Sequence, residues 1–333
     1  IFFKTNYKNK KIPKKLILKN TSRKSDESAE DMKIKCMSAG RAHSVVVTKN
    51  GTIFTLGNNS YGQCGRNIIK DEVYKGSHIV HRIENGSFTG EGEEIVSVEC
   101  GQDHTMFLTN LGKVYTCGWG ADGQTGQGHY MNSSEIKEIE GDIKGEKIVK
   151  LACSSDCVLA VNENGEVFGW GNSEYGQLDD SEDAAQQINT PKALELTKGH
   201  GKIKDVASGG SFCMILNEEG LVYTWGYGIL GFGPFVQQGN RPEQLLPPLF
   251  GRNDFSDKTS VVSIGSGVFH MGAINSDGDL FVWGKNRFSC LGLGHKKDQF
   301  FPFKTAVNGK VLKVGFGVDH TIALVKDLCK NKV

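Results

Sequence analysis

The sequence predicts an all-β fold of the β-propeller type, and two observations lead to this prediction. One pattern recurs six times: a short β-branched run, a Gly-x-x-His step, an apolar strand, a turn with glycine, a second strand and a glycine-rich tail. Glycine is also abundant, at 43 of 333 residues, against a usual share of roughly 7%. Because glycine disfavours helices, such a chain is expected to form short strands joined by tight turns.

Each copy supplies the strands of one blade in a fixed order. The β-branched run before the step is expected to form a first strand, and in the best copy Thr105–Thr109 and Lys113–Cys117 form a hairpin. Several hairpin turns carry dipeptides that accept a positive φ: Asn50-Gly51, Asn164-Gly165 and Asp277-Gly278. Part of the loop between units can supply a fourth strand, which completes a blade.

Two independent markers give the repeat length. The first position of the step recurs at spacings of 61, 53, 55, 58 and 50, at Gly40, Gly101, Ser154, Gly209, Gly267 and Gly317. The residue before the later glycine recurs at 61, 53, 55 and 58, at Leu56, Cys117, Trp170, Trp225 and Trp283. The agreement shows a true repeat, and about 50–60 residues is enough for a four-stranded blade.

The repeats divide the chain into three parts. Residues 1–33 are expected to form a basic N-terminal segment with the remnant of a preceding blade, and residues 328–333 a C-terminal tail. The repeats fill residues 34–327 and start near residues 34, 95, 148, 203, 261 and 311. The sixth copy stops halfway, so we expect a seven-bladed propeller whose first blade is incomplete in this fragment, with the completing strands upstream of Ile1.

The glycine-rich tails Asn58–Gly65 and Trp170–Leu178, together with the Gly-x-x-His steps, resemble the regulator of chromosome condensation repeat over residues 34–327. Strings such as NNSYGQCGR, GWGADGQTG and FVWGKN are most similar to a mitochondrial, exchange-factor-like branch of that family. The resemblance implies a mitochondrial protein, in the matrix or peripherally associated with the inner membrane. It implies a protein that works by binding and not by covalent catalysis.

The step residues are the candidate site. Histidine fills its last position in four copies, at His43, His104, His270 and His320, while Cys157 and Phe212 fill it in the other two. Because cysteine and phenylalanine replace it, a histidine that packs or closes a turn is favoured over a metal or acid–base ring.

A second interpretation of the same step comes from the family resemblance. In the chromatin-bound exchange factor of this family, acidic and histidine residues of the step face the small GTPase Ran. Position by position, this implies GTPase-facing roles for Asp103, His104, Asp319 and His320, and also for His43 and His270. The implied mechanism is displacement: loops that bind the nucleotide-free GTPase speed the release of its nucleotide.

One departure from the family argues against Ran itself as the partner. The chromatin-bound factor carries an inserted wedge after the second hairpin strand of one blade. The corresponding tail here, residues 118–128, has no insertion. A nuclear Ran exchange factor is therefore the third choice among the functions considered.

The N-terminal segment suggests an RNA partner. Residues 1–24 hold nine Lys or Arg and no acid, whereas the rest of the chain holds 30 basic and 38 acidic residues. A solvated loop is the simplest interpretation, and contact with RNA phosphates is the functional one. The candidate RNA contacts are Lys8, Lys10, Lys11, Lys14 and Lys15.

Besides the nuclear Ran exchange factor, which is the third choice, two functions are considered further. The first is a mitochondrial adaptor that binds ribosomal RNA or assembly factors and supports ribosome biogenesis and translation. The second is a guanine-nucleotide exchange factor for a mitochondrial GTPase, with the dynamin-like fusion GTPase of the inner membrane as candidate. No DNA partner is expected. Long loops between repeats are further candidate contacts. For residues 234–260, with their Arg and aromatic residues, a plain connection between blades is favoured over contact with RNA or a protein.

Other classes of function find no support in the sequence. The glycine-rich strings precede no helix pattern and lack a Gly-Lys-Ser/Thr ending, so they predict turns and not phosphate loops. The nine cysteines include no Cys-x-x-Cys pair, and most lie in apolar strand patterns, so we predict a reducing compartment, no metal and no cofactor. The sequence contains no run of 18 or more apolar residues, so it predicts no membrane span.

Overall fold

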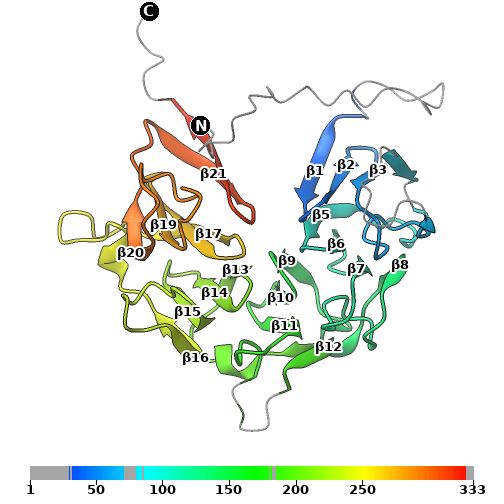
Figure 1. Cartoon of the computed structure of the whole chain (residues 1–333), viewed down its shortest axis with the longest axis horizontal. Coiled ribbons are helices and arrows are strands. Elements are labelled where there is room, and N and C mark those ends of the chain that lie inside the picture. The colour runs from blue at the N-terminus through cyan, green and yellow to red at the C-terminus, as the bar shows by residue number, and fades with distance from the viewer. Residues whose placement is uncertain are drawn as a thin grey trace, which may run out of the picture.

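A computed structural model describes residue 30 and residues 32–70, 80–84, 86–179, 181 and 185–327. These residues form five four-stranded antiparallel sheets and one two-stranded sheet, with strands paired in chain order. The sheets follow one another around a ring, with β1 and β21 on the two sides of an opening (Figure 1). The predicted all-β propeller is confirmed, and the number of seven blades stays a prediction.

We number the sheets blade 1 to blade 6 in chain order. The strands of the first three blades, from the axis outward, are β1 (Ile34–Ala39), β2 (His43–Thr48), β3 (Ile53–Gly57), β4 (Val80–Ile83); β5 (Ile95–Cys100), β6 (His104–Thr109), β7 (Val114–Gly118), β8 (Ser133–Glu138); and β9 (Ile148–Ala152), β10 (Cys157–Asn162), β11 (Val167–Asn172), β12 (Gln187–Ala193). The fourth strand expected from the inter-repeat loop is therefore present in each of these blades.

Blades 4 and 5 follow the same plan, and blade 6 has the first two strands of it. Their strands are β13 (Ile203–Ser208), β14 (Phe212–Asn217), β15 (Val222–Tyr227), β16 (Gln238–Gln244); β17 (Val261–Ser266), β18 (His270–Asn275), β19 (Leu280–Gly284), β20 (Gln299–Lys304); and β21 (Lys310–Phe316), β22 (Thr321–Lys326). Short 3-10 turns, η2 (Gly141–Ile143), η3 (Glu195–Thr197) and η4 (Pro247–Phe250), lie in the links between blades. Among the described segments, no helix is long and apolar enough to cross a bilayer.

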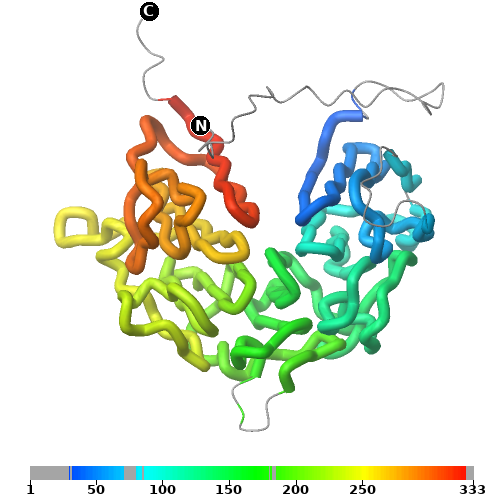
Figure 2. The backbone as a smooth tube through the Cα atoms, in the orientation of Figure 1, coloured from blue at the N-terminus to red at the C-terminus, as the bar shows by residue number. Residues whose placement is uncertain are grey.

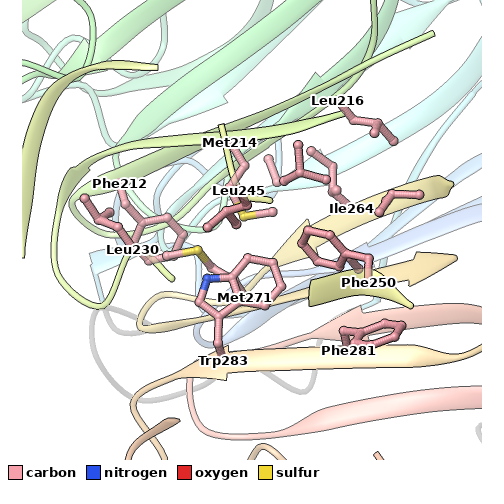
Figure 3. Packing of buried hydrophobic residues seen from close by; sticks show 14 residues of the cluster. Phe212, Met214, Leu216, Leu230, Leu245, Phe250, Ile264, Met271, Phe281 and Trp283 are labelled. Carbon is pink, nitrogen blue, oxygen red and sulfur yellow. The ribbon is translucent and has the colours of Figure 1, made fainter. Parts of the chain in front are cut away.

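The core lies between neighbouring blades. Met214 and Leu216 of blade 4 share one buried cluster with Met271 and Trp283 of blade 5 (Figure 3). This arrangement follows from the flatness of a sheet: each blade buries its two faces only by stacking on its neighbours. The tube drawing shows the consequence, a chain that passes from blade to blade in sequence order (Figure 2).

The tryptophans that marked the repeat in the sequence lie in these interfaces. Trp170, Trp225 and Trp283 are all fully buried. The indole N–H of Trp170 donates to the carbonyl of Gln124 at 3.0 Å, and that of Trp225 to the carbonyl of Gln177 at 2.7 Å. In both cases the acceptor belongs to the preceding blade, so the ring fixes the spacing between two blades.

Candidate partner-binding face

The strand order places the steps and the tails at one end of the ring. In each complete blade the first strand ends at the step, the second begins there, and the third returns to the same end before the glycine-rich tail. We call this end the step face. The turns between second and third strands, such as the turn at Leu111, lie at the opposite end, which we call the hairpin face.

Within a blade, the tail is tied to the step by a backbone hydrogen bond. The amide of Trp119 donates to the carbonyl of Asp103 at 2.9 Å, and the amide of Asn172 donates to Asp156 at 2.8 Å. The intervening Gly118 has φ of +116°, and a Cβ there would lie 2.6 Å from the carbonyl oxygen of Asp103. Glycine is required because the two loops approach too closely for a side chain.

Three of the four step histidines are buried between blades. His43 and His270 place Nε2 at 2.9 and 3.0 Å from the hydroxyls of Thr105 and Thr321. Each threonine follows the last step position of the next blade. Burial lowers the pKa of His43 and of His270 to about 4, so both imidazoles are neutral at pH 7.

The same inter-blade position carries different pairs elsewhere in the ring. The sulfurs of Cys157 and Cys213 lie 3.7 Å apart, and Phe212 shares a buried cluster with Met271. His104 is the exception, because Val158 occupies the position at which the threonines offer a hydroxyl.

His104 is consequently left without a hydrogen-bond partner. Both of its ring nitrogens lack one within the described residues, and burial lowers its pKa to about 4. These contacts agree with the packing interpretation of the step. Direct contact of His43, His104 or His270 with a GTPase stays a prediction.

The step aspartates also join neighbouring blades. The carboxylate of Asp103 accepts from the Arg41 guanidinium and, at 3.2 Å, from Nε2 of Gln63. Asp156 accepts from Nε2 of Gln124 at 2.8 Å. Burial raises the pKa of both carboxyls. The positive charge of Arg41 partly offsets this rise in the pKa of Asp103. The sequence reasoning missed Asp156, although its Ser-Ser-Asp-Cys string aligns with Gly-x-Asp-His.

The two remaining candidates belong to the step of blade 6, the last described blade, which has no next blade packed against it among the described residues. His320 is exposed, and the carboxylate of Asp319 lies 3.6 Å from Nη2 of Arg287. Arg287 is itself held over two aromatic rings, 4.6 Å from the centroid of Phe288 and 5.9 Å from that of Phe269. Blades 5 and 6 thus present a charged and aromatic cluster on the step face.

Further aromatic pairs lie at two other blade junctions of this face. Tyr61 and Trp119 meet edge to face with centroids 4.5 Å apart, and Tyr175 stacks on Tyr227 at 4.8 Å. Tyr227 is 41% exposed. The sequence reasoning did not single out these rings; the signal was their recurrence at matching tail positions. Exposed aromatic side chains with arginine are typical of protein-binding surfaces.

An open cavity of about 770 Å³ lies at the axis of the ring, lined by the inner strands and the steps. Across it, the hydroxyl of Ser154 donates to the carbonyl of Ser266 at 2.7 Å. Glu99 lies in its wall, and burial raises the pKa of this carboxyl to about 7 although Lys150 opposes the shift. Lys150 is engaged by Asp205 at 3.3 Å. The described residues bring together no trio of His, Cys, Asp or Glu that could hold a metal ion.

The candidate RNA contacts Lys8, Lys10, Lys11, Lys14 and Lys15 lie outside the described residues. Their role stays a prediction from the sequence.

Comparison with known proteins agrees with this geometry. The model of the RCC1-like domain matches residues 79–329, and that of the regulator of chromosome condensation (RCC1) repeat matches residues 34–63. The chain belongs to the RCC1-like propeller family. It is 48% identical over 297 residues to the mouse RCC1-like G exchanging factor-like protein and 46% identical to the human one. These matches cover 89% of the chain and 63% and 62% of the relatives, so the chain spans somewhat less than two thirds of their length.

Solved structures give the same result. The crystal structure of human WBSCR16 is similar with a TM-score of 0.83 and 46% identity, over 89% of this chain and 72% of that one. Yeast RCC1 (Prp20), in a complex with Kap60, has a TM-score of 0.73 at 21% identity, over 87% of this chain and 67% of that one, which shows a shared fold.

Proposed function

We propose that this chain is a non-catalytic propeller that binds a guanine-nucleotide-binding protein through its step face and speeds the release of that protein's nucleotide. The observation that carries the proposal is the set of exposed rings and Arg287 on one face, spread over several blade junctions. A rigid scaffold that displays such side chains suits protein recognition. The names of the mouse and human relatives, which call them G exchanging factor-like, support the class of partner.

The proposed mechanism uses binding energy alone. Loops tied to a rigid ring bind the nucleotide-free form of the GTPase more tightly than the loaded form, and this difference in affinity shifts the population toward the empty form. The step residues contribute by holding the loops: the Arg41–Asp103–Gln63 contacts fix blade 1 against blade 2 at the face. The compact tail at residues 118–128 supports a partner other than Ran.

An exchange assay tests this proposal. The dynamin-like fusion GTPase of the mitochondrial inner membrane, loaded with fluorescent GDP, is mixed with the purified chain and the release rate is followed. We expect faster release, and we expect Tyr227→Ala together with Phe288→Ala to remove most of the acceleration. Leu111→Ala is the matched control, because Leu111 is 52% exposed on the hairpin face.

Two outcomes count against the proposal. If the intact chain neither binds this GTPase nor changes its release rate, the partner is wrong. If the control substitution on the hairpin face reduces the rate as much as the double substitution does, the step face is not the contact.

A second candidate function rests on a separate observation, the nine basic and no acidic residues among residues 1–24. It is that of an adaptor for mitochondrial ribosomal RNA or ribosome-assembly factors, with support of mitochondrial translation as the outcome. Ultraviolet crosslinking in intact cells, followed by sequencing of the attached RNA, tests it. Neutralising Lys8, Lys10, Lys11, Lys14 and Lys15 should abolish the crosslinks and flatten the salt dependence of binding; crosslinks that survive would exclude this segment. Mitochondrial localisation belongs to both proposals and rests on the family resemblance.

A further inference from the structure

A pair of cysteine side chains lies inside the interface between blades 3 and 4. Cys157 begins β10 and Cys213 is the second residue of β14. Their sulfurs are 3.7 Å apart, and both residues are fully buried. This is the position at which two other interfaces carry a histidine and a threonine, one carries a phenylalanine and a methionine, and one carries His104 and Val158.

The backbones of the two cysteines are held together by one serine. Ser208 is opposite Cys213 in the register of β13 and β14. Its hydroxyl lies 2.9 Å from the carbonyl of Cys157 in the neighbouring blade. The two cysteines are thus presented to each other by a buried contact that does not depend on the thiols.

The distance to be closed is small. A disulfide places its sulfurs about 2.0 Å apart, so the two sulfurs need to approach by roughly 1.7 Å from the present separation.

We propose that Cys157 and Cys213 form a reversible disulfide that joins blades 3 and 4 when the protein meets a low-molecular-weight disulfide such as oxidised glutathione. One cysteine thiolate attacks the reagent, which forms a mixed disulfide and releases one glutathione. The second thiolate then attacks the mixed disulfide, which forms the Cys157–Cys213 bond and releases the second glutathione. The two cysteine protons end on the two glutathione thiols, and two electrons pass to the reagent.

The reaction is expected to be slow and to follow local opening of the step face. Burial raises the pKa of Cys213 well above its ordinary value, so little thiolate is present while the interface is closed. The residues that precede the two strands, Asp156 and Ser211, are partly exposed on that face. Opening of these steps gives the reagent its access, and a partner docked on the step face would slow the reaction.

Oxidation of the purified chain tests the inference. The protein is incubated in glutathione buffers of graded redox ratio, alkylated, digested without reduction and mapped by mass spectrometry. We expect a linked peptide containing Cys157 and Cys213, and a rise in Tm of about 4–8 °C that reductant reverses. Cys213→Ala should lose both effects. Cys117→Ala should keep both, since the Cys117 sulfur faces the carbonyl of Gln63.

Two results would overturn the inference. One is the recovery of both cysteines as free thiols after oxidation of the unaltered chain, a readout that does not depend on any variant folding. The other is a linkage of either cysteine to a different partner. An equal rise in Tm for Cys213→Ala would show that the stabilisation comes from another bond.

Discussion

Replacing Thr105 with valine removes the hydroxyl that joins blade 1 to blade 2. This hydroxyl is fully buried and has two partners: it donates to the carbonyl of Gln63 at 2.7 Å and lies 2.9 Å from Nε2 of His43. Because its one proton goes to Gln63, the imidazole of His43 acts as the donor and is protonated on Nε2. Valine keeps the shape of the side chain but leaves Nε2 of His43 without this partner and leaves the carbonyl of Gln63 with only the weak contact of the Cys117 thiol at 3.8 Å.

The magnitude follows from the two groups that lose a partner. A buried donor or acceptor left unsatisfied costs about 1–3 kcal/mol, so Thr105→Val should lower the free energy of unfolding by roughly 2–4 kcal/mol. Thr224→Val is the matched control, since the hydroxyl of Thr224 is also buried and donates to the carbonyl of Leu230 within its own blade. The control should cost about half as much.

Urea unfolding of the two variants and the unaltered chain measures these differences. The converse substitution, Val158→Thr, offers a hydroxyl to His104, whose ring nitrogens are unpartnered in the described structure. It should raise stability by about 0.5–1.5 kcal/mol. A loss at Thr105→Val no larger than at Thr224→Val would refute the inter-blade role of the histidine, as would a destabilising Val158→Thr.

Two further predictions concern pH. In the folded protein the pKa values of His43, His104 and His270 are about 4, against 6.5 ordinarily, so the unfolded chain binds more protons between pH 4 and pH 6.5. The stability that these histidines contribute should therefore be complete above pH 6.5 and decline from there to about pH 4. A Tm that is flat over that window would contradict the burial of these rings. The effect of pH on stability has the opposite sign at Glu99, because the pKa of this carboxyl is raised from 4.5 to about 7 and its contribution to stability is lost as the pH rises through that window. Glu99→Gln should therefore raise Tm more at pH 8 than at pH 5. An equal change in Tm at both values would exclude titration of this carboxyl as the cause.

The fold was predictable because the repeat leaves chemical marks at a constant spacing. Trp170, Trp225 and Trp283 served as markers in the sequence, and the structure shows the physical reason: each ring fills the gap between one blade and its neighbour. The glycines of the steps and tails are required by close backbone approach, as at Gly118. Such constraints act in every blade, so they recur and can be recognised without a structure.

The candidate site was only partly predictable. The step residues were found from their repetition, but their burial follows from contacts with residues distant in sequence: His43 meets Thr105, 62 positions away. The exposed rings of Tyr227 and Phe288 could not be distinguished from core aromatics by residue type alone. The accessibility of Tyr227 depends on how its tail meets that of Tyr175 at a blade junction, which the strand pattern does not specify.

The most direct test of the proposed function is photocrosslinking of the full-length protein in cells, with a photoreactive amino acid in place of Tyr227 on the step face or Leu111 on the hairpin face. If the step face binds a guanine-nucleotide-binding protein, that class of protein should be crosslinked from position 227 and not from position 111. Crosslinks to such a protein from position 111 alone, or to RNA in its place from position 227, would contradict the account.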